Sequence, residues 1–99
     1  MMPKKRPTHP GEFIKEEILK ELSMTQEQLA KEIGVSRKTI NQLVNEKRGI
    51  SVDIALQIGR FTNTSPEMWL NLQAAVDIWD AYHSPNFKSI KNIRSYTEN

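Results

Sequence analysis

The chain has 99 residues, and its 14 Lys and Arg residues against 12 Asp and Glu residues give a formal net charge of +2. This length fits one domain with a modest core, so we expect its stability to be shared with a second subunit or another partner. The sequence has no cysteine and two histidines, which excludes disulfide bridges and thiolate metal sites and argues against a zinc site.

The N-terminal segment, residues 1–9, is basic. No apolar stretch follows it, so it lacks the pattern of a secretory signal. The longest apolar run in the chain has three residues, whereas a membrane-spanning helix needs roughly 20. We therefore expect a cytoplasmic protein without a membrane partner. Its folded domain is expected over residues 10–83 and a polar, weakly ordered tail over residues 84–99.

Capping residues and apolar periodicity predict five helices and no strand, which is an all-α fold. The first helix begins near Pro10, a residue favoured at the first helical position, and ends before Ser23. Ile14, Ile18 and Leu22 recur at intervals of four residues. They predict one apolar face on this helix.

The second and third helices are spaced as in a helix-turn-helix. Thr25 and Gln28 form a T-x-x-Q capping box at the start of the second helix, and Gly34 suits its left-handed end. Ser36 can cap a third helix over residues 37–45, which leaves a turn of about three residues. A helix-turn-helix needs a turn of this length, so the third helix is the expected recognition helix.

Two further helices follow. The fourth begins at Ser51, and the fifth runs from Ser65 and Pro66 to about Tyr82. Apolar residues cover most of the circumference of the fifth helix, more than a helix on a monomer surface needs. We therefore expect this helix to pack both on its own domain and on a second copy of the chain. The residues expected at this dimer interface are Met68, Trp69, Leu72, Val76, Trp79 and Tyr82.

The positive charge is concentrated in the first half of the chain. Residues 1–50 hold ten basic residues against seven acidic ones, whereas residues 51–99 hold four against five. Residues 36–48 alone carry a net charge of +3, with Glu46 as the single acid. Glu46 borders the exposed side of the expected recognition helix, so we expect it either to lie beyond the DNA groove that such a helix enters or to pair with a neighbouring lysine.

The third helix presents a polar face that suits the edges of bases. A helical wheel places Ile40, Leu43 and Val44 together on the opposite side. Asn and Gln can pair bidentately with adenine, and Lys can reach guanine, while basic residues at the helix ends can contact phosphates. A solvated polar face without a ligand is the alternative. The predicted DNA-binding residues are Gln26, Ser36, Arg37, Lys38, Thr39, Asn41, Gln42, Asn45, Lys47 and Arg48.

Other chemistry has weaker support. His9, Glu12 and Glu16 fall near one face of the first helix and are potential metal ligands. A capped helix with acids in its first turn explains the same residues, so we expect no metal and no cofactor. The chain has no glycine-rich phosphate loop and no nucleophile elbow, and with its two histidines it does not resemble an enzyme.

Several segments resemble the HigA-type antitoxins, which are phage-repressor-like helix-turn-helix proteins. The narrowest matches are HPGE at residues 9–12 and TSPEMWLNLQ at residues 64–73, accompanied by SRKTIN at residues 36–41 and NEKRGIS at residues 45–51. The resemblance covers roughly residues 8–82. It therefore leaves residues 84–99 without an assigned role.

This resemblance implies a DNA-binding antitoxin that represses its own operon and neutralises a small RelE-like toxin, which cleaves mRNA on the ribosome. It also implies that Arg37, Lys38, Thr39, Asn41 and Arg48 face the DNA. A dimer would bind double-stranded operator DNA as an inverted repeat with half-sites about one helical turn apart. The alternative is a stand-alone repressor without a toxin partner.

Overall fold

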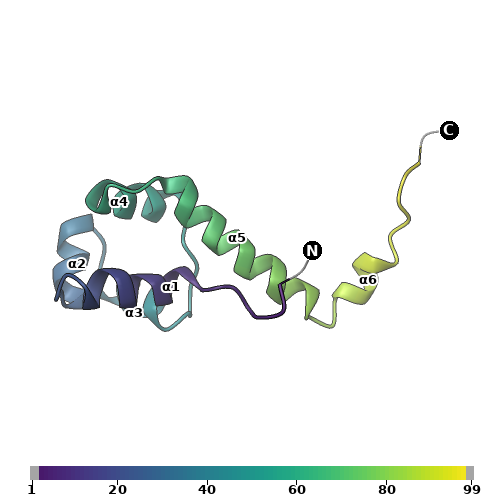
Figure 1. The fold of residues 1–99 in the computed structure, drawn as a ribbon, viewed down its shortest axis with the longest axis horizontal. Helices are drawn as coiled ribbons and strands as arrows, with labels where there is room; N and C mark the ends of the chain where they lie inside the picture. Colours follow the sequence, from purple (N-terminus) through teal and green to yellow (C-terminus); the bar gives the residue numbers. More distant parts are fainter. Residues whose placement is uncertain (1–2, 98–99) are drawn as a thin grey trace.

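The computed structural model describes residues 3–97, which are all helical or irregular, with no strand. The helices are α1 (Pro10–Phe13), α2 (Gln26–Ile33), α3 (Arg37–Val44), α4 (Val52–Thr62), α5 (Pro66–Tyr82) and α6 (Phe87–Lys91). A π-helical segment, η1 (Ile14–Lys20), continues α1. Figure 1 shows α1 to α4 gathered as a bundle, with α5 running diagonally away from it. The predicted all-α fold class is therefore confirmed.

The helix limits follow the predicted caps. Thr25 Oγ1 accepts from Gln28 N at 3.0 Å, and Gln28 Oε1 accepts from Thr25 N at 2.9 Å, so the capping box is complete. Ser36 and Ser65 also accept from the backbone three residues later, as N-caps do. Gly34 ends α2 in the left-handed conformation, with φ at 79°. The turn between α2 and α3 thus has the predicted length.

The first and last predicted segments need correction. The first helical unit ends at Lys20, and Leu22 lies in the turn beyond it with 55% of its surface exposed. Of the three predicted apolar residues, Ile14 and Ile18 are therefore buried and Leu22 is not. The tail after residue 83, which we expected to be polar and weakly ordered, contains a sixth helix, α6, beyond the five predicted. No side chain caps α6, but Phe87 packs on Tyr82 with ring centroids 4.6 Å apart.

The core lies where α1, η1, α2, α3, α4 and the first half of α5 meet. Ile14, Leu29 and Ile40 are completely buried in it. Trp69 is also buried, with its ring edge-on to Phe13 and its Nε1 donating to the Thr64 hydroxyl at 2.8 Å. This core fixes the two helices of the helix-turn-helix against the rest of the domain.

The second half of α5 projects beyond the bundle (Figure 1). The described residues extend over 56 × 26 × 22 Å, which is elongated for a chain of this size. Along the projecting half, Ile78 and Tyr82 are about half exposed, at 55% and 49%. Within residues 3–97, no helix combines the length and apolar character that crossing a membrane requires.

Candidate nucleic-acid interface

Helix α3 buries one side and exposes the other. Ile40 and Leu43 are completely buried, whereas Lys38, Asn41 and Asn45 are exposed. This division of α3 into an apolar and a polar side agrees with the helical wheel. The polar side is therefore free to meet a ligand along the length of the helix.

A hydrogen bond joins the polar side of α3 to the start of α2. Asn41 Nδ2 donates to Gln26 Oε1 at 3.2 Å, and Asn45 Nδ2 donates to the Asn41 carbonyl at 2.9 Å. Gln26 is the first residue of α2, so the fold brings it to α3 across 15 residues of sequence. These bonds orient the amides of three predicted DNA-binding residues before any ligand binds.

A second cluster surrounds Arg48, which follows α3. Its Nη1 donates to Thr39 Oγ1 at 3.3 Å and to Gln42 Oε1 at 3.4 Å. The Thr39 hydroxyl in turn shares a hydrogen bond of 2.9 Å with the Ser36 hydroxyl. The turn after α3 therefore folds back and places a guanidinium on the side of the recognition helix, where its remaining N–H groups can reach a phosphate.

The remaining predicted DNA-binding residues are basic. Arg37 and Lys38 line a shallow groove together with Asn41, and Lys47 is exposed in the turn after α3. All ten predicted residues thus lie on α3, at its two ends, or at the adjoining start of α2. The surface can offer amide groups to bases and cations to the surrounding phosphates.

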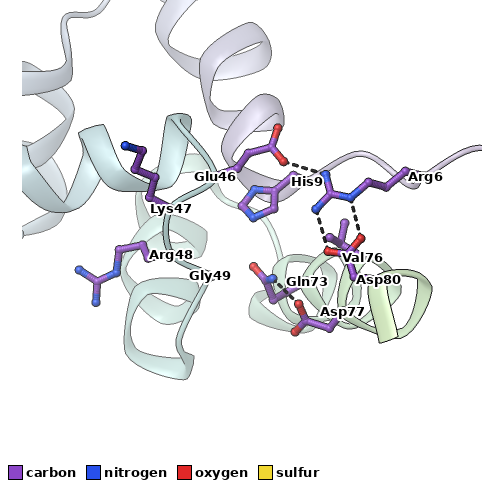
Figure 2. Close-up of a pocket in the computed structure, with 10 residues that line it drawn as sticks. All are labelled: Arg6, His9, Glu46, Lys47, Arg48, Gly49, Gln73, Val76, Asp77 and Asp80. Atoms are coloured by element: carbon purple, nitrogen blue, oxygen red, sulfur yellow. Dashed lines mark hydrogen bonds and ion pairs between the residues drawn. The ribbon is translucent and has the colours of Figure 1, made fainter. Parts of the chain in front are cut away.

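Sequence reasoning missed Arg6, which lies in the N-terminal segment. Its guanidinium donates to Glu46 at 2.7 Å and to both carboxylate oxygens of Asp80 at 2.8 and 2.9 Å (Figure 2). Glu46 therefore pairs with Arg6. The expectation that it pairs with a neighbouring lysine is wrong. The hydrogen bonds from Arg6 lower the pKa of Asp80, and the two carboxylates raise the pKa of Arg6. The only hint in the sequence was the isolated acid among basic residues.

The residues expected at a dimer interface fall into two groups. Trp69 and Val76 are 1% exposed within their own chain, so their side chains have no surface to offer a second copy. Periodicity could not separate them from the others, because a helix apolar on most sides does not show which side its own domain covers. The remaining four keep accessible surface: Met68, Leu72, Trp79 and Tyr82.

His9 is the N-cap residue of α1. His9 is buried, and its Nδ1 accepts a hydrogen bond from Gly11 N at 2.9 Å. Among residues 3–97, no group of three or more His, Cys, Asp or Glu side chains is arranged to hold a metal ion. The hydrogen bond from Gly11 N to His9 Nδ1 supports the capping interpretation of His9.

Comparisons with known proteins agree with this geometry. Residues 15–69 match the helix-turn-helix family. Antitoxin HigA-1 of Vibrio cholerae is 38% identical over 77 residues, which cover 78% of this chain and 72% of the relative. These comparisons point to antitoxins and DNA-binding regulators and not to enzymes, as the residue inventory predicted.

Two solved structures are also similar. One is the Pseudomonas aeruginosa antitoxin HigA with the higBA promoter, with a TM-score of 0.82 and 41% identity, covering 90% of this chain and 97% of that chain. The other is antitoxin GraA in complex with its operator, with a TM-score of 0.86 and 35% identity, covering 99% of each chain. In both structures an antitoxin is accompanied by DNA, a promoter in the first and an operator in the second.

Proposed function

Because the chain belongs to the HigA-type antitoxin family of helix-turn-helix DNA-binding proteins, we propose that it represses its own operon as a dimer and neutralises a RelE-like toxin. The observation that carries the DNA-binding part is the exposed polar side of α3, whose amides are oriented by the bond between Asn41 and Gln26. The proposed toxin neutralisation is supported by the similar proteins, which are themselves HigA antitoxins.

In this proposal, α3 enters the major groove. Asn41, Gln42 and Asn45 would read base edges, because amides present a donor and an acceptor together and pair bidentately with adenine. Lys38 would reach guanine from the same side of the helix. A polar side with this composition could distinguish one DNA sequence from another, whereas a purely basic surface would contact phosphates at any sequence.

The ends of α3 would fix the position of the protein on the duplex. Arg37 lies at the first position of α3, and Lys47 and Arg48 lie in the turn that follows it. The Thr39 hydroxyl accepts a hydrogen bond from Arg48 and shares another with the Ser36 hydroxyl. Contacts from these residues to phosphates contribute affinity at every sequence and depend strongly on salt. Specificity and register would then come from different residues of the same surface.

The dimer in this proposal forms through the projecting half of α5. Tyr82 and Trp79 keep accessible surface there, and aromatic residues are frequent anchors at interfaces. A two-fold dimer would present two recognition helices to successive major grooves, so the operator would be an inverted repeat. Residues 10–83 would form the DNA-binding and dimerisation domain of a cytoplasmic regulator.

Two measurements test this function. Fluorescence anisotropy with DNA from the promoter of the chain's own operon should show binding that a scrambled duplex does not reproduce. Expression of the chain should restore growth of cells that express the toxin gene adjacent to its own. Operator binding without growth rescue would indicate a stand-alone repressor, and equal affinity for both duplexes would refute sequence-specific recognition.

A further inference from the structure

The guanidinium of Arg6 joins three parts of the molecule. Arg6 belongs to the N-terminal segment, Glu46 to the turn after the recognition helix, and Asp80 to α5. The contact to Asp80 is a two-oxygen fork, with Nε and Nη2 each donating to one carboxylate oxygen. Such forks define the relative orientation of their partners more closely than a single bond does. Arg6 is thus held in one geometry by α5 and presents its third nitrogen to Glu46.

Glu46 has an unusual backbone for its residue type. Its φ is 57°, in the left-handed region that glycine and asparagine adopt more readily. Two bonds complete this tight turn: Glu46 N donates to the Leu43 carbonyl at 3.0 Å, and Lys47 N donates to the Gln42 carbonyl at 2.8 Å. A glutamate at this position aims its carboxylate at Arg6, which a glycine could not do.

The far end of the same turn is also tied to α5. Gln73 Oε1 accepts a hydrogen bond from Ile50 N at 2.8 Å, and Gln73 Nε2 donates to Asp77 at 3.0 Å. Gly49 makes this approach possible, because a Cβ there would lie 2.8 Å from the Gln73 amide carbon. The turn is therefore attached to α5 at both ends, through Glu46 and through Ile50.

The two proposed phosphate-binding residues lie between these attachments. Figure 2 shows Lys47 and Arg48 on the opposite side of the turn from Arg6, pointing away from it. The three residues border one pocket, but the side chains of Lys47 and Arg48 extend away from the Arg6 guanidinium, which is held by Glu46 and Asp80. The effect of Arg6 on Lys47 and Arg48 would pass through the backbone of the turn.

These ion pairs are too exposed to act mainly on folding stability. The side chains of Arg6, Glu46 and Asp80 are 37%, 38% and 48% exposed. Surface pairs of this kind contribute little to the free energy of unfolding. Their geometry is nevertheless specific, and it connects the DNA-binding surface to α5.

We propose that Arg6 is a positioning residue for DNA binding: by holding Glu46 against α5, it sets the turn that carries Lys47 and Arg48. The inference rests on the proposed function, because it takes α3 and this turn as the DNA-binding surface. In a dimer joined through α5, the same contact would also link each recognition helix to the dimer interface. Arg6 would then support operator binding without contacting the DNA itself.

The test compares variants of the full chain by operator affinity. We expect Arg6→Ala to weaken operator binding roughly tenfold while changing the melting temperature by no more than about 4 °C, the size expected for a surface pair. Lys5→Ala is the matched control, because it removes one positive charge from the same segment; it should change affinity by less than about twofold. Equal losses for both variants would show a general charge effect and would overturn the proposal.

Two further variants separate positioning from charge. Glu46→Gln removes a negative charge beside the DNA, so affinity should rise if Arg6 merely neutralises Glu46. Positioning predicts that affinity falls instead, and that Arg6→Ala adds little in the Glu46→Gln background. Arg6→Lys keeps the charge but loses the two-oxygen fork, so it should restore only part of the affinity. Full recovery with Arg6→Lys, or tighter binding with Glu46→Gln, would refute the positioning role.

The salt dependence supplies an independent measurement. A positioning residue leaves the slope of log affinity against log salt unchanged, whereas loss of a direct phosphate contact lowers it by about 0.9. Asn41→Ala separates the inference from the function on which it rests. If Asn41→Ala weakens operator binding and Arg6→Ala does not, the role of Arg6 is refuted and the DNA-reading surface stands. If neither has an effect, the DNA-reading surface itself is refuted.

Discussion

Gly11 lies directly against the main-chain carbonyl of Leu43. A Cβ built on Gly11 would collide with the oxygen of that carbonyl. Because Leu43 belongs to the recognition helix, the missing side chain allows α1 to pack closely on α3. The position of the recognition helix therefore depends on a glycine more than 30 residues away in the sequence.

Gly11→Ala should destabilise the protein strongly. The added methyl group meets rigid backbone and not a flexible side chain, so α1 and α3 must separate. We expect the free energy of unfolding to fall by about 1–3 kcal/mol, measured by urea denaturation. Gly34→Ala is the control for this steric contact. No atom lies within 4 Å of the Cβ position of Gly34, so only the backbone conformation, with φ at 79°, disfavours an alanine there. A Gly11→Ala variant as stable as the wild type would contradict the close packing.

His9→Ala should remove the cap of the first helix. The Gly11 N–H would lose its acceptor in a buried site, which costs about 1–2 kcal/mol of unfolding free energy. Asparagine caps helices well, so His9→Asn should recover part of this loss. Thermal denaturation of the two variants provides the measurement, and equal stability of His9→Ala and wild type would count against the capping role.

Variants of the recognition helix should affect specific binding. We expect Asn41→Ala or Arg37→Ala to weaken binding to the operator by roughly 1–3 kcal/mol. Lys47→Ala should weaken binding to all duplexes alike and reduce the salt slope by about 1. Anisotropy titrations with operator and scrambled duplexes distinguish the two effects. Unchanged operator affinity in both helix variants would refute the assignment of α3.

Self-association should depend on the projecting half of α5. Trp79 stacks on His83 with centroids 3.7 Å apart, and its ring keeps accessible surface. Trp79→Ala should therefore loosen a dimer and weaken operator binding while leaving α3 intact. Sedimentation velocity measures the first effect. Lys88→Ala on α6 is a control outside the proposed interface, and an unaltered dimer in Trp79→Ala would contradict the interface.

The pair between Arg6 and Asp80 should respond to acid. The hydrogen bond from Arg6 lowers the pKa of Asp80 in the folded protein. The pair therefore contributes its stabilisation fully above the ordinary pKa of an aspartate and loses it as pH falls through the lowered folded value. Carboxyl NMR titration should show Asp80 below its usual range, and Arg6→Ala should move it back up. An unshifted Asp80 in the wild type would contradict the pair.

Local features of the fold were predictable because their contacts are short-range. Thr25 and Gln28 cap each other across three residues, and Gly34 adopts the left-handed conformation that its missing side chain permits. The polar side of α3 followed from helical periodicity. Leu22 was predicted wrongly, since periodicity does not show that the helical unit stops at Lys20.

The all-α class, the helix-turn-helix spacing and the polar composition of α3 could be read from the sequence, because caps, turns and helix faces depend on residues a few positions apart. Two features depend on packing between distant segments: Trp69 is covered by its own domain, and Arg6 joins Glu46 and Asp80, 40 and 74 residues away. These partners meet because the core packs α1, α3 and α5 in one arrangement. Such packing depends on the whole chain at once, so no local pattern encodes it.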